Sequence, residues 1–125
     1  MNPNPVGWFE IYVQYLNRAK KFYEHVLAIE LTKLESPVPG LEMLAFPMNM
    51  ESAGASGALA KMEGCPSGGL GTLVYFVCED CANALARVES AGGKICKPKV
   101  SIGQYGFMAL VMDTEGNMIG LHSMK

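Results

Sequence analysis

Hydrophobic and polar positions change their spacing several times along the first half of the chain. Aromatic and β-branched residues dominate positions 9–13, with one glutamate among them, and this run predicts a strand. From Asn17, a candidate N-cap, apolar residues recur at helical spacing as far as Leu27, which predicts a helix. Three further apolar runs predict strands, near 30–34, 41–46 and 57–62.

The same order of elements begins again after a glycine-rich segment. A strongly β run at 73–78 is followed by Asp80, which can cap a helix, and by apolar positions at helical spacing up to Val88. The pair Gly92-Gly93 is typical of a helix end. Three more strands complete the pattern, near 94–100, 107–112 and 118–123.

Aligning the two halves matches strand with strand and helix with helix. The chain is therefore interpreted as two βαβββ modules, about 6–63 and 72–125, joined by a linker at about 64–71 within a single domain, 1–125. A half of this kind cannot close its own core. We expect an α+β fold in which both modules form one cupped, eight-stranded mixed sheet with the helices outside. The concave face of that sheet is the natural pocket for a ligand.

Composition and charge narrow the classes of partner. Of the 125 residues, 50% are hydrophobic and 18% are charged, which argues against a disordered chain. The formal net charge of −2 does not indicate a basic surface for binding nucleic acid or an anionic membrane. No apolar run approaches the roughly 20 residues that span a bilayer, and the N-terminus lacks the features of a secretion signal. We expect a soluble, cytoplasmic protein without nucleic-acid or membrane partners.

Two of the four cysteines form a CxxC motif, Cys78 and Cys81. A tetrahedral zinc site needs a second close pair, but Cys65 and Cys96 stand alone in the sequence. The acidic residues between the two sulfurs disfavour a reactive thiolate. The pattern favours ordinary, part-buried residues at a strand-to-helix junction, and no disulfide is expected in a reducing compartment.

Short motifs spread over nearly the whole chain resemble those of one superfamily. The run Trp8-Phe9-Glu10-Ile11 and the helical segment 17–23 resemble the opening module of the vicinal oxygen chelate superfamily, which includes glyoxalases, bleomycin resistance proteins and extradiol dioxygenases. Segments 74–76, 84–88 and 91–93 resemble its second module. The turn at 113–119 resembles the family's closing D-P-x-G-N turn, with Thr114 in place of the usual proline. Within the superfamily the chain is most similar to glyoxalase-related and bleomycin-resistance-like proteins.

The resemblance implies that the metal ligands of the family fall on four strands. Carried over residue by residue, these positions are Trp8, Gly57, Leu73 and Gly120. None of these side chains can ligate a divalent cation, and metal catalysis needs three protein ligands or more. We therefore expect no metal cofactor and no glyoxalase or dioxygenase activity of the metal-dependent kind.

Strand alternation selects the side chains that line the predicted cup. If Trp8 points inward, so do Glu10 and Tyr12, and if Gly120 points inward, so does His122. The same parity places further residues on the inner wall, and a following loop adds two candidates for ligand contact. The predicted ligand-binding residues are Trp8, Tyr12, Leu59, Lys61, Leu73, Tyr75, Gln104 and Tyr105, with Val77 on the same face.

Glu10 is the most informative polar residue, because a carboxylate among aromatic and aliphatic neighbours is costly to bury unpaired. It is either a base or hydrogen-bond acceptor for a substrate, or a structural residue that pairs with Lys61 or Arg18 or reaches solvent. His122 is a candidate partner or proton carrier, since its ordinary pKa lies near neutrality. Together Glu10 and His122 could still hold a weak, atypical metal ion, although two ligands are fewer than a typical site has.

Two functions follow from these residues and from the resemblance. The first is a metal-independent binder of a small, partly apolar molecule, as in bleomycin resistance proteins. The alternative is a lyase or isomerase related to lactoylglutathione lyase that uses Glu10, with His122, as acid and base. A regulatory module is neither supported nor excluded. By resemblance we also expect a homodimer, with Trp8 and the loop 48–56 as candidate contacts.

Overall fold

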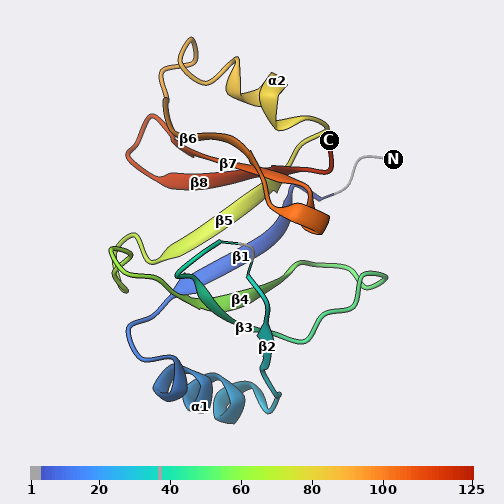
Figure 1. Ribbon diagram of the computed structural model, residues 1–125, viewed down its shortest axis with the longest axis vertical. Coiled ribbons are helices and arrows are strands. Elements are labelled where there is room, and N and C mark those ends of the chain that lie inside the picture. Colours follow the sequence, from blue (N-terminus) through green and yellow to red (C-terminus); the bar gives the residue numbers. More distant parts are fainter. Residues whose placement is uncertain (1–3, 37) are drawn as a thin grey trace. The chain divides into compact units, whose positions relative to one another are not determined.

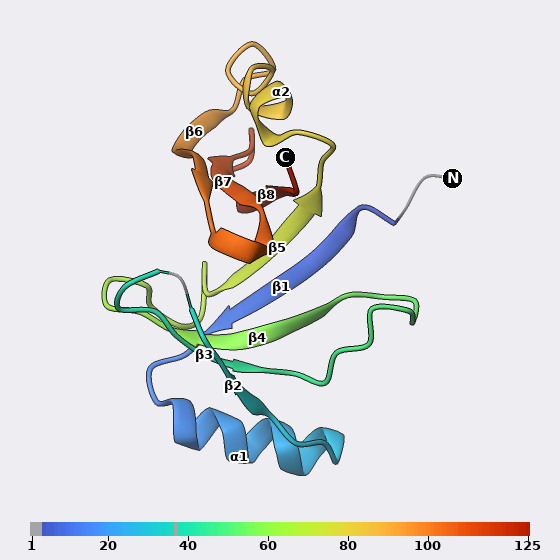
Figure 2. The same cartoon turned by 45° about the vertical axis from the view of Figure 1, so that its right-hand side comes forward.

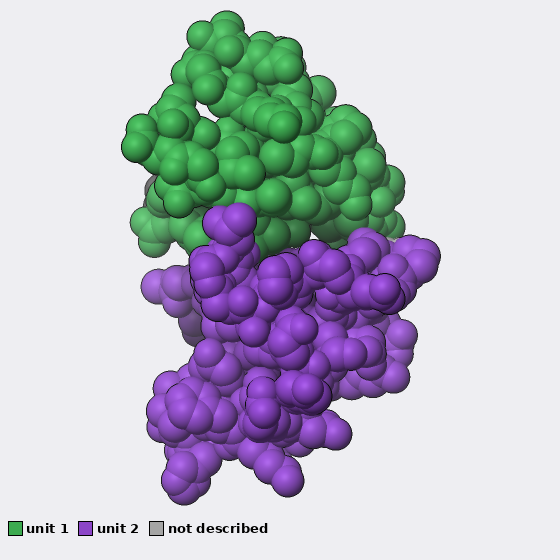
Figure 3. Space-filling view, turned by 90° about the vertical axis from the view of Figure 1, so that its left-hand side faces the viewer, with its two compact units in different colours: residues 1–7, 73–125 green, residues 8–72 purple. Residues whose placement is uncertain are grey.

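The computed structural model describes residues 4–36 and 38–125 and divides them into two compact units (Figure 3). Residues Trp8–Thr72 are the N-terminal unit. Leu73–Lys125, together with the residues before Trp8, are the C-terminal unit. The glycine-rich segment 64–71, predicted to be a linker, belongs to the N-terminal unit.

The N-terminal unit contains one helix and four strands, counted within the described residues (Figure 1). In chain order they are β1 (Val6–Tyr12), α1 (Leu16–Leu27), β2 (Thr32–Leu34), β3 (Glu42–Ala45) and β4 (Ser56–Lys61). The spatial order of the strands is β2-β3-β4-β1. β1 runs parallel to β4, and the other neighbours are antiparallel.

The C-terminal unit repeats this arrangement and adds a short 3-10 helix. Its elements are β5 (Thr72–Val77), α2 (Cys81–Leu85), β6 (Lys94–Ser101), the 3-10 helix η1 (Gly103–Tyr105), β7 (Phe107–Met112) and β8 (Met118–Ser123). The strand order is β5-β8-β7-β6, with β5 parallel to β8. In the described part of the chain the elements form two βαβββ modules with mixed strand pairing, which confirms the predicted α+β class.

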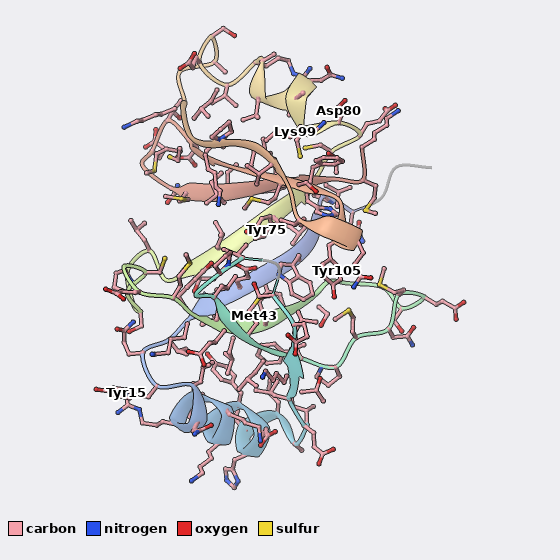
Figure 4. The ribbon with its side chains drawn as sticks, viewed as in Figure 1. Tyr15, Met43, Tyr75, Asp80, Lys99 and Tyr105 are labelled. Atoms are coloured by element: carbon pink, nitrogen blue, oxygen red, sulfur yellow. The ribbon has the colours of Figure 1, made fainter. Side chains whose placement is uncertain are left out.

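The first helix begins two residues earlier than predicted. Tyr15, and not Asn17, occupies the N-cap position in an extended conformation and makes no side-chain capping bond. The helix ends at Leu27. The C-cap residue Ala28 has a left-handed backbone (φ 54°), and its N–H donates to the carbonyl of Glu24. Tyr15, labelled in Figure 4, is 63% exposed, and the side chains of Phe22 and Val26 are each more than half exposed. Neither α-helix of the described residues is long and apolar enough to cross a bilayer.

The predicted cap of the second helix is confirmed. The Asp80 carboxylate accepts a hydrogen bond from the backbone N–H of Ala82 at 2.9 Å. The same carboxylate oxygen lies 2.9 Å from the ammonium of Lys99, and the two side chains lie close together in Figure 4. The hydrogen bond that the Lys99 ammonium donates, together with the one from the Ala82 N–H, lowers the pKa of Asp80. The α-helix is shorter than the pattern predicts, because regular helical bonding ends at Leu85 and turns continue to Gly92.

Each helix packs on one face of its own strands (Figures 1 and 2). Under α1, the buried residues Leu31, Phe46 and Leu59 contact β1 and helix side chains, including Phe9, Ile11, Leu16, Ala19 and Tyr23. Under α2, the cluster is built on Cys81, Ala109, Val111 and Leu121. Burial of these apolar side chains is the main favourable contribution to folding.

The register of β1 and β4 corrects one part of the predicted inner wall. Ile11 pairs with Leu59, so Leu59 lies on the face covered by α1. Lys61 is two residues further along the same strand and therefore lies on that face too. Gly57 pairs with Phe9 on that same face. The predicted placement of Gly57, Leu59 and Lys61 beside Trp8 is therefore wrong by one residue, and a slip of one residue moves every side chain to the opposite face.

The corresponding expectation for the C-terminal unit is confirmed. Tyr75 pairs with Gly120, and Val77 pairs with His122. Leu73 and Tyr75 are two residues apart on one strand and share a face. These side chains lie opposite the cluster under α2, on the face for which the sequence predicted them.

We expect Leu59→Ala to lower the free energy of unfolding by about 2–5 kcal/mol, because it empties a fully buried site under α1. Urea denaturation followed by circular dichroism measures the change. The matched control, Lys61→Ala, alters an exposed side chain on the same strand and should stay within about 0.5 kcal/mol of the wild type. Equal stabilities for the two variants would contradict the register described here.

Candidate ligand-binding site

The carboxylate of Glu10 is buried and held by two neighbours on the same strand. The indole Nε1–H of Trp8 donates to Glu10 Oε2 at 3.2 Å, and the hydroxyl of Tyr12 donates to Oε1 at 2.8 Å. Residues two apart on a strand point to the same face, so the spacing Trp-x-Glu-x-Tyr alone brings these donors to the carboxylate. Glu10 is only 6% exposed.

The surroundings of Glu10 are otherwise apolar. Met43, Ala58 and Ala60 form a buried cluster with Trp8 and Tyr12, and Leu34 and Leu41 pack against it. Glu10 pairs with Ala58 and Tyr12 pairs with Ala60, which places small side chains beside the carboxylate. We call this side of the N-terminal unit the Glu10 face; it comprises Trp8, Glu10, Tyr12, Met43, Ala58 and Ala60.

Burial raises the pKa of Glu10, because a low-dielectric surrounding disfavours the charged form. The hydrogen bonds from Tyr12 and Trp8 act in the opposite direction but do not overcome burial. A carboxyl group with a raised pKa in an apolar setting is suited to exchange a proton with a bound molecule.

None of the three structural explanations for a glutamate at this position holds. Lys61 lies on the opposite face and is exposed. The guanidinium of Arg18 lies 4.4 Å above the ring of Tyr15. No ion pair of residues 4–36 and 38–125 includes Glu10, and its low exposure excludes a solvated carboxylate.

His122 is held by a backbone carbonyl in the C-terminal unit. Its Nε2 lies 2.5 Å from the carbonyl oxygen of Tyr105. A carbonyl oxygen only accepts hydrogen bonds, so Nε2 carries the proton in this arrangement. Tyr105 closes η1, which also contains the predicted contact residue Gln104. Glu10 and His122 belong to different units, and their acid–base pairing stays a prediction.

The residues at the positions expected for a family metal do not fit a divalent cation. A Cβ at Gly120 would collide with the ring of Tyr75, so the phenol fills the space that a longer ligand side chain needs. A Cβ at Gly57 would collide with Phe9. The Trp8 indole donates to Glu10, and Leu73 is a hydrocarbon. In the described part of the chain, no group of three or more His, Cys, Asp or Glu side chains is placed to hold a metal.

The two cysteines of the CxxC motif lie where the sequence places them, at the junction of β5 and α2. Cys81 is fully buried, its N–H donates to Ser123 Oγ at 3.0 Å, and its sulfur accepts from the same hydroxyl at 3.1 Å. Burial raises the pKa of the Cys78 thiol, with the nearby Cys81 adding to the effect. The raised pKa favours a neutral, unreactive thiol at Cys78.

Sequence reasoning selected Trp8, Glu10 and Tyr12 but did not connect them with one another. The signal was present, because two donors at positions i−2 and i+2 of a strand reach the same carboxylate. Met43, which completes the Glu10 face from β3, was not selected. The expected homodimer, with Trp8 and the loop 48–56 as contacts, concerns a second chain and stays a prediction.

Comparisons with known proteins agree with this fold. A family model described as the Glyoxalase/Bleomycin resistance protein/Dioxygenase superfamily matches residues 6–121. No curated protein matches the sequence significantly.

Similar solved structures include two bacterial methylmalonyl-CoA epimerases and an archaeal protein. The enzyme from Mycobacterium tuberculosis has a TM-score of 0.67 and 15% identity, covering 95% of this chain and 87% of that chain. A variant of the Streptomyces coelicolor enzyme, in complex with 2-nitronate-propionyl-CoA, has a TM-score of 0.68 and 15% identity over 98% of both chains. An uncharacterized protein from Methanosarcina mazei has a TM-score of 0.61 and 18% identity, covering 98% of this chain and 94% of that one. At such identities the likeness shows the fold alone.

We expect Glu10→Gln to remove a specific pH dependence of stability. Because the pKa of Glu10 is raised in the folded state, the folded protein binds this proton more tightly than the unfolded chain does. The free energy of unfolding of the wild type therefore loses this contribution as pH rises from the ordinary carboxyl pKa through the raised one. Relative to the wild type, Glu10→Gln should gain stability over that window and then level off.

Urea denaturation at a series of pH values measures this difference. The control Phe22→Ala changes an exposed residue without a titratable group and should differ from the wild type by the same amount at every pH. If Glu10→Gln also differed by a constant amount, the raised pKa of Glu10 would be refuted.

Proposed function

The chain belongs to the Glyoxalase/Bleomycin resistance protein/Dioxygenase superfamily, and on this premise we propose that it binds a small, partly apolar molecule on the Glu10 face without a metal ion. The observation that carries the proposal is the Glu10 carboxylate, buried among apolar side chains and paired with no cation of the described residues. An apolar surface with a few well-placed polar groups is the usual composition of a small-molecule site.

Energetics support a functional reason for this carboxylate. Removing an ionised group from water costs on the order of several kcal/mol, even after relaxation and hydrogen bonding. Two neutral donors offset part of this cost, whereas a hydrophobic residue at position 10 would avoid it altogether. Carboxyl groups whose pKa is shifted by burial are found often at functional sites.

The solved neighbours add support of a general kind. Structures of methylmalonyl-CoA epimerase include complexes with 2-nitronate-propionyl-CoA and with methylmalonyl-CoA. This fold therefore accommodates small-molecule ligands in those proteins. The proposal for the present chain rests on its own Glu10 face and differs from a metal-dependent site in its side chains.

The single tryptophan of the chain provides a direct test of binding. The ¹H–¹⁵N spectrum contains one indole signal, which belongs to the N–H that Trp8 donates to Glu10. Small amphiphilic compounds are first screened for those that raise the melting temperature of the protein. We expect these compounds to shift the indole signal until it saturates, and to do so equally when EDTA is present. Glu10→Gln should weaken their binding about tenfold, as loss of a charged hydrogen-bond partner does.

The matched control is Phe22→Ala, which alters an exposed residue of α1 and should leave binding unchanged. Stabilising compounds that leave the indole signal in place would bind elsewhere and would refute the Glu10 face as the site. Binding that disappears with EDTA would refute the metal-free part of the proposal.

A second candidate function is favoured by the raised pKa of Glu10. In this alternative the chain is a lyase or isomerase, and the carboxylate removes a proton from a carbon next to a carbonyl. Trp8 and Tyr12 orient the carboxylate through their hydrogen bonds. In this alternative His122 donates a proton from Nε2–H after that group leaves the carbonyl oxygen of Tyr105.

Solvent exchange separates the enzyme from the binder. With methylmalonyl-CoA as the probe in D₂O, an enzyme of this kind incorporates deuterium at the carbon between the two carbonyl groups. Glu10→Gln should slow this incorporation by about 10²–10⁴-fold while the probe still shifts the Trp8 signal. Equal exchange rates for wild type and variant would exclude Glu10 as the base.

A further inference from the structure

We infer that the ligand of the Glu10 face carries an organic cation, an amine or amidine, joined to an apolar body. This inference rests on the proposed function and names the class of molecule that the site selects. Its basis is the pattern of charge and acceptor capacity around Glu10, together with the two aromatic rings beside it.

The Glu10 carboxylate has acceptor capacity that the protein does not use. An ionised carboxylate offers about four lone-pair sites on its two oxygens. Trp8 donates to one oxygen and Tyr12 to the other, one hydrogen bond each. Each oxygen can therefore accept a further donor from a bound molecule. A donor that is itself charged makes a bond roughly twice as strong as a neutral one.

The described strands of the N-terminal unit supply no positive charge on this face. Following the pairing from β1, the side chains next to Glu10 on the same face are Ala58 on β4, then Ala45 on β3, then Thr32 on β2. The lysines of these strands, Lys61 and Lys33, pair with Glu42 and Leu44 on the α1 face. On the described strands of this unit, Glu10 is thus the one charged side chain of its face.

The rings beside the carboxylate leave its charge uncompensated. Trp8 and Tyr12 are both half-buried and both direct a neutral polar edge at Glu10. A neutral alcohol leaves the buried charge uncompensated, and an anion is repelled by it.

The apolar body of the ligand lies along the apolar side chains in the same row of the Glu10 face. Ala45, two strands across from Glu10 and about 10 Å away, lines one side of a groove of about 670 Å³. The wall of that groove also includes Glu30, Leu34 and Phe46, and Glu10 does not line it.

A set of three probes of equal length tests this inference: 4-phenylbutylamine, 4-phenylbutan-1-ol and 4-phenylbutyrate. Titrations followed at the Trp8 indole signal give an affinity for each. We expect the amine to bind at least about tenfold more tightly than the alcohol, and the carboxylate to bind most weakly. In Glu10→Gln the preference for the amine over the alcohol should disappear.

The matched control is Glu42→Gln, the same substitution on β3 with its side chain on the α1 face. It should keep the preference for the amine, because it leaves the Glu10 face unchanged. Should Glu10→Gln fail to fold, the comparison of amine with alcohol on the wild type still decides the question.

The outcomes separate the inference from the proposed function. If the alcohol shifts the Trp8 signal with an affinity equal to or higher than that of the amine, the cation inference is wrong and the proposed binding function stands. If none of the three probes shifts the signal at saturating concentrations, both are overturned.

Discussion

A buried carboxylate held only by neutral donors is the constraint on which the N-terminal unit depends. Trp8 and Tyr12 donate one hydrogen bond each to Glu10, and no cation of the described residues balances its charge. The surrounding cluster of Met43, Ala58 and Ala60 excludes water and so raises the pKa of the carboxyl group. The features that make Glu10 costly to bury are also those on which the proposed binding function rests.

The two faces of the N-terminal strands divide structural and chemical roles. The α1 face contains large apolar side chains, such as Leu59 and Phe46, which pack against the helix and contribute most of the hydrophobic stabilisation. The Glu10 face has alanines on β4 beside its carboxylate. Because side chains alternate along a strand, the large apolar residues lie on one face and the buried carboxylate lies on the other. In the C-terminal unit, the ring of Tyr75 fills the space above Gly120 on the face opposite α2. A divalent-metal ligand at position 120 is incompatible with that packing.

Much of the fold was predictable because it depends on local patterns. Hydrophobic periodicity located both modules, and the Asp80 cap was read correctly because an acceptor before a helix bonds to a nearby N–H. The shared face of Tyr75, Gly120 and His122 was also correct. Gly57, Leu59 and Lys61 were assigned to the wrong face, because the register of β4 against β1 depends on the conformation of the long loop that precedes β4. Asn17 was a plausible cap by residue type, yet the packing of Leu16 and Ala19 starts the helix at Leu16.

By itself, the sequence determined the order of elements, the resemblance to the superfamily and the grouping of Trp8, Glu10 and Tyr12 on one side of a strand. All of these follow from spacings of a few residues, which backbone geometry converts directly into shared faces. Only the tertiary structure decided that Glu10 is buried without a cation, that Lys61 lies on the far face and that Tyr75 occupies the space at Gly120. Burial and charge pairing depend on which distant segments meet and in what register, and that choice is made by the packing of the whole unit.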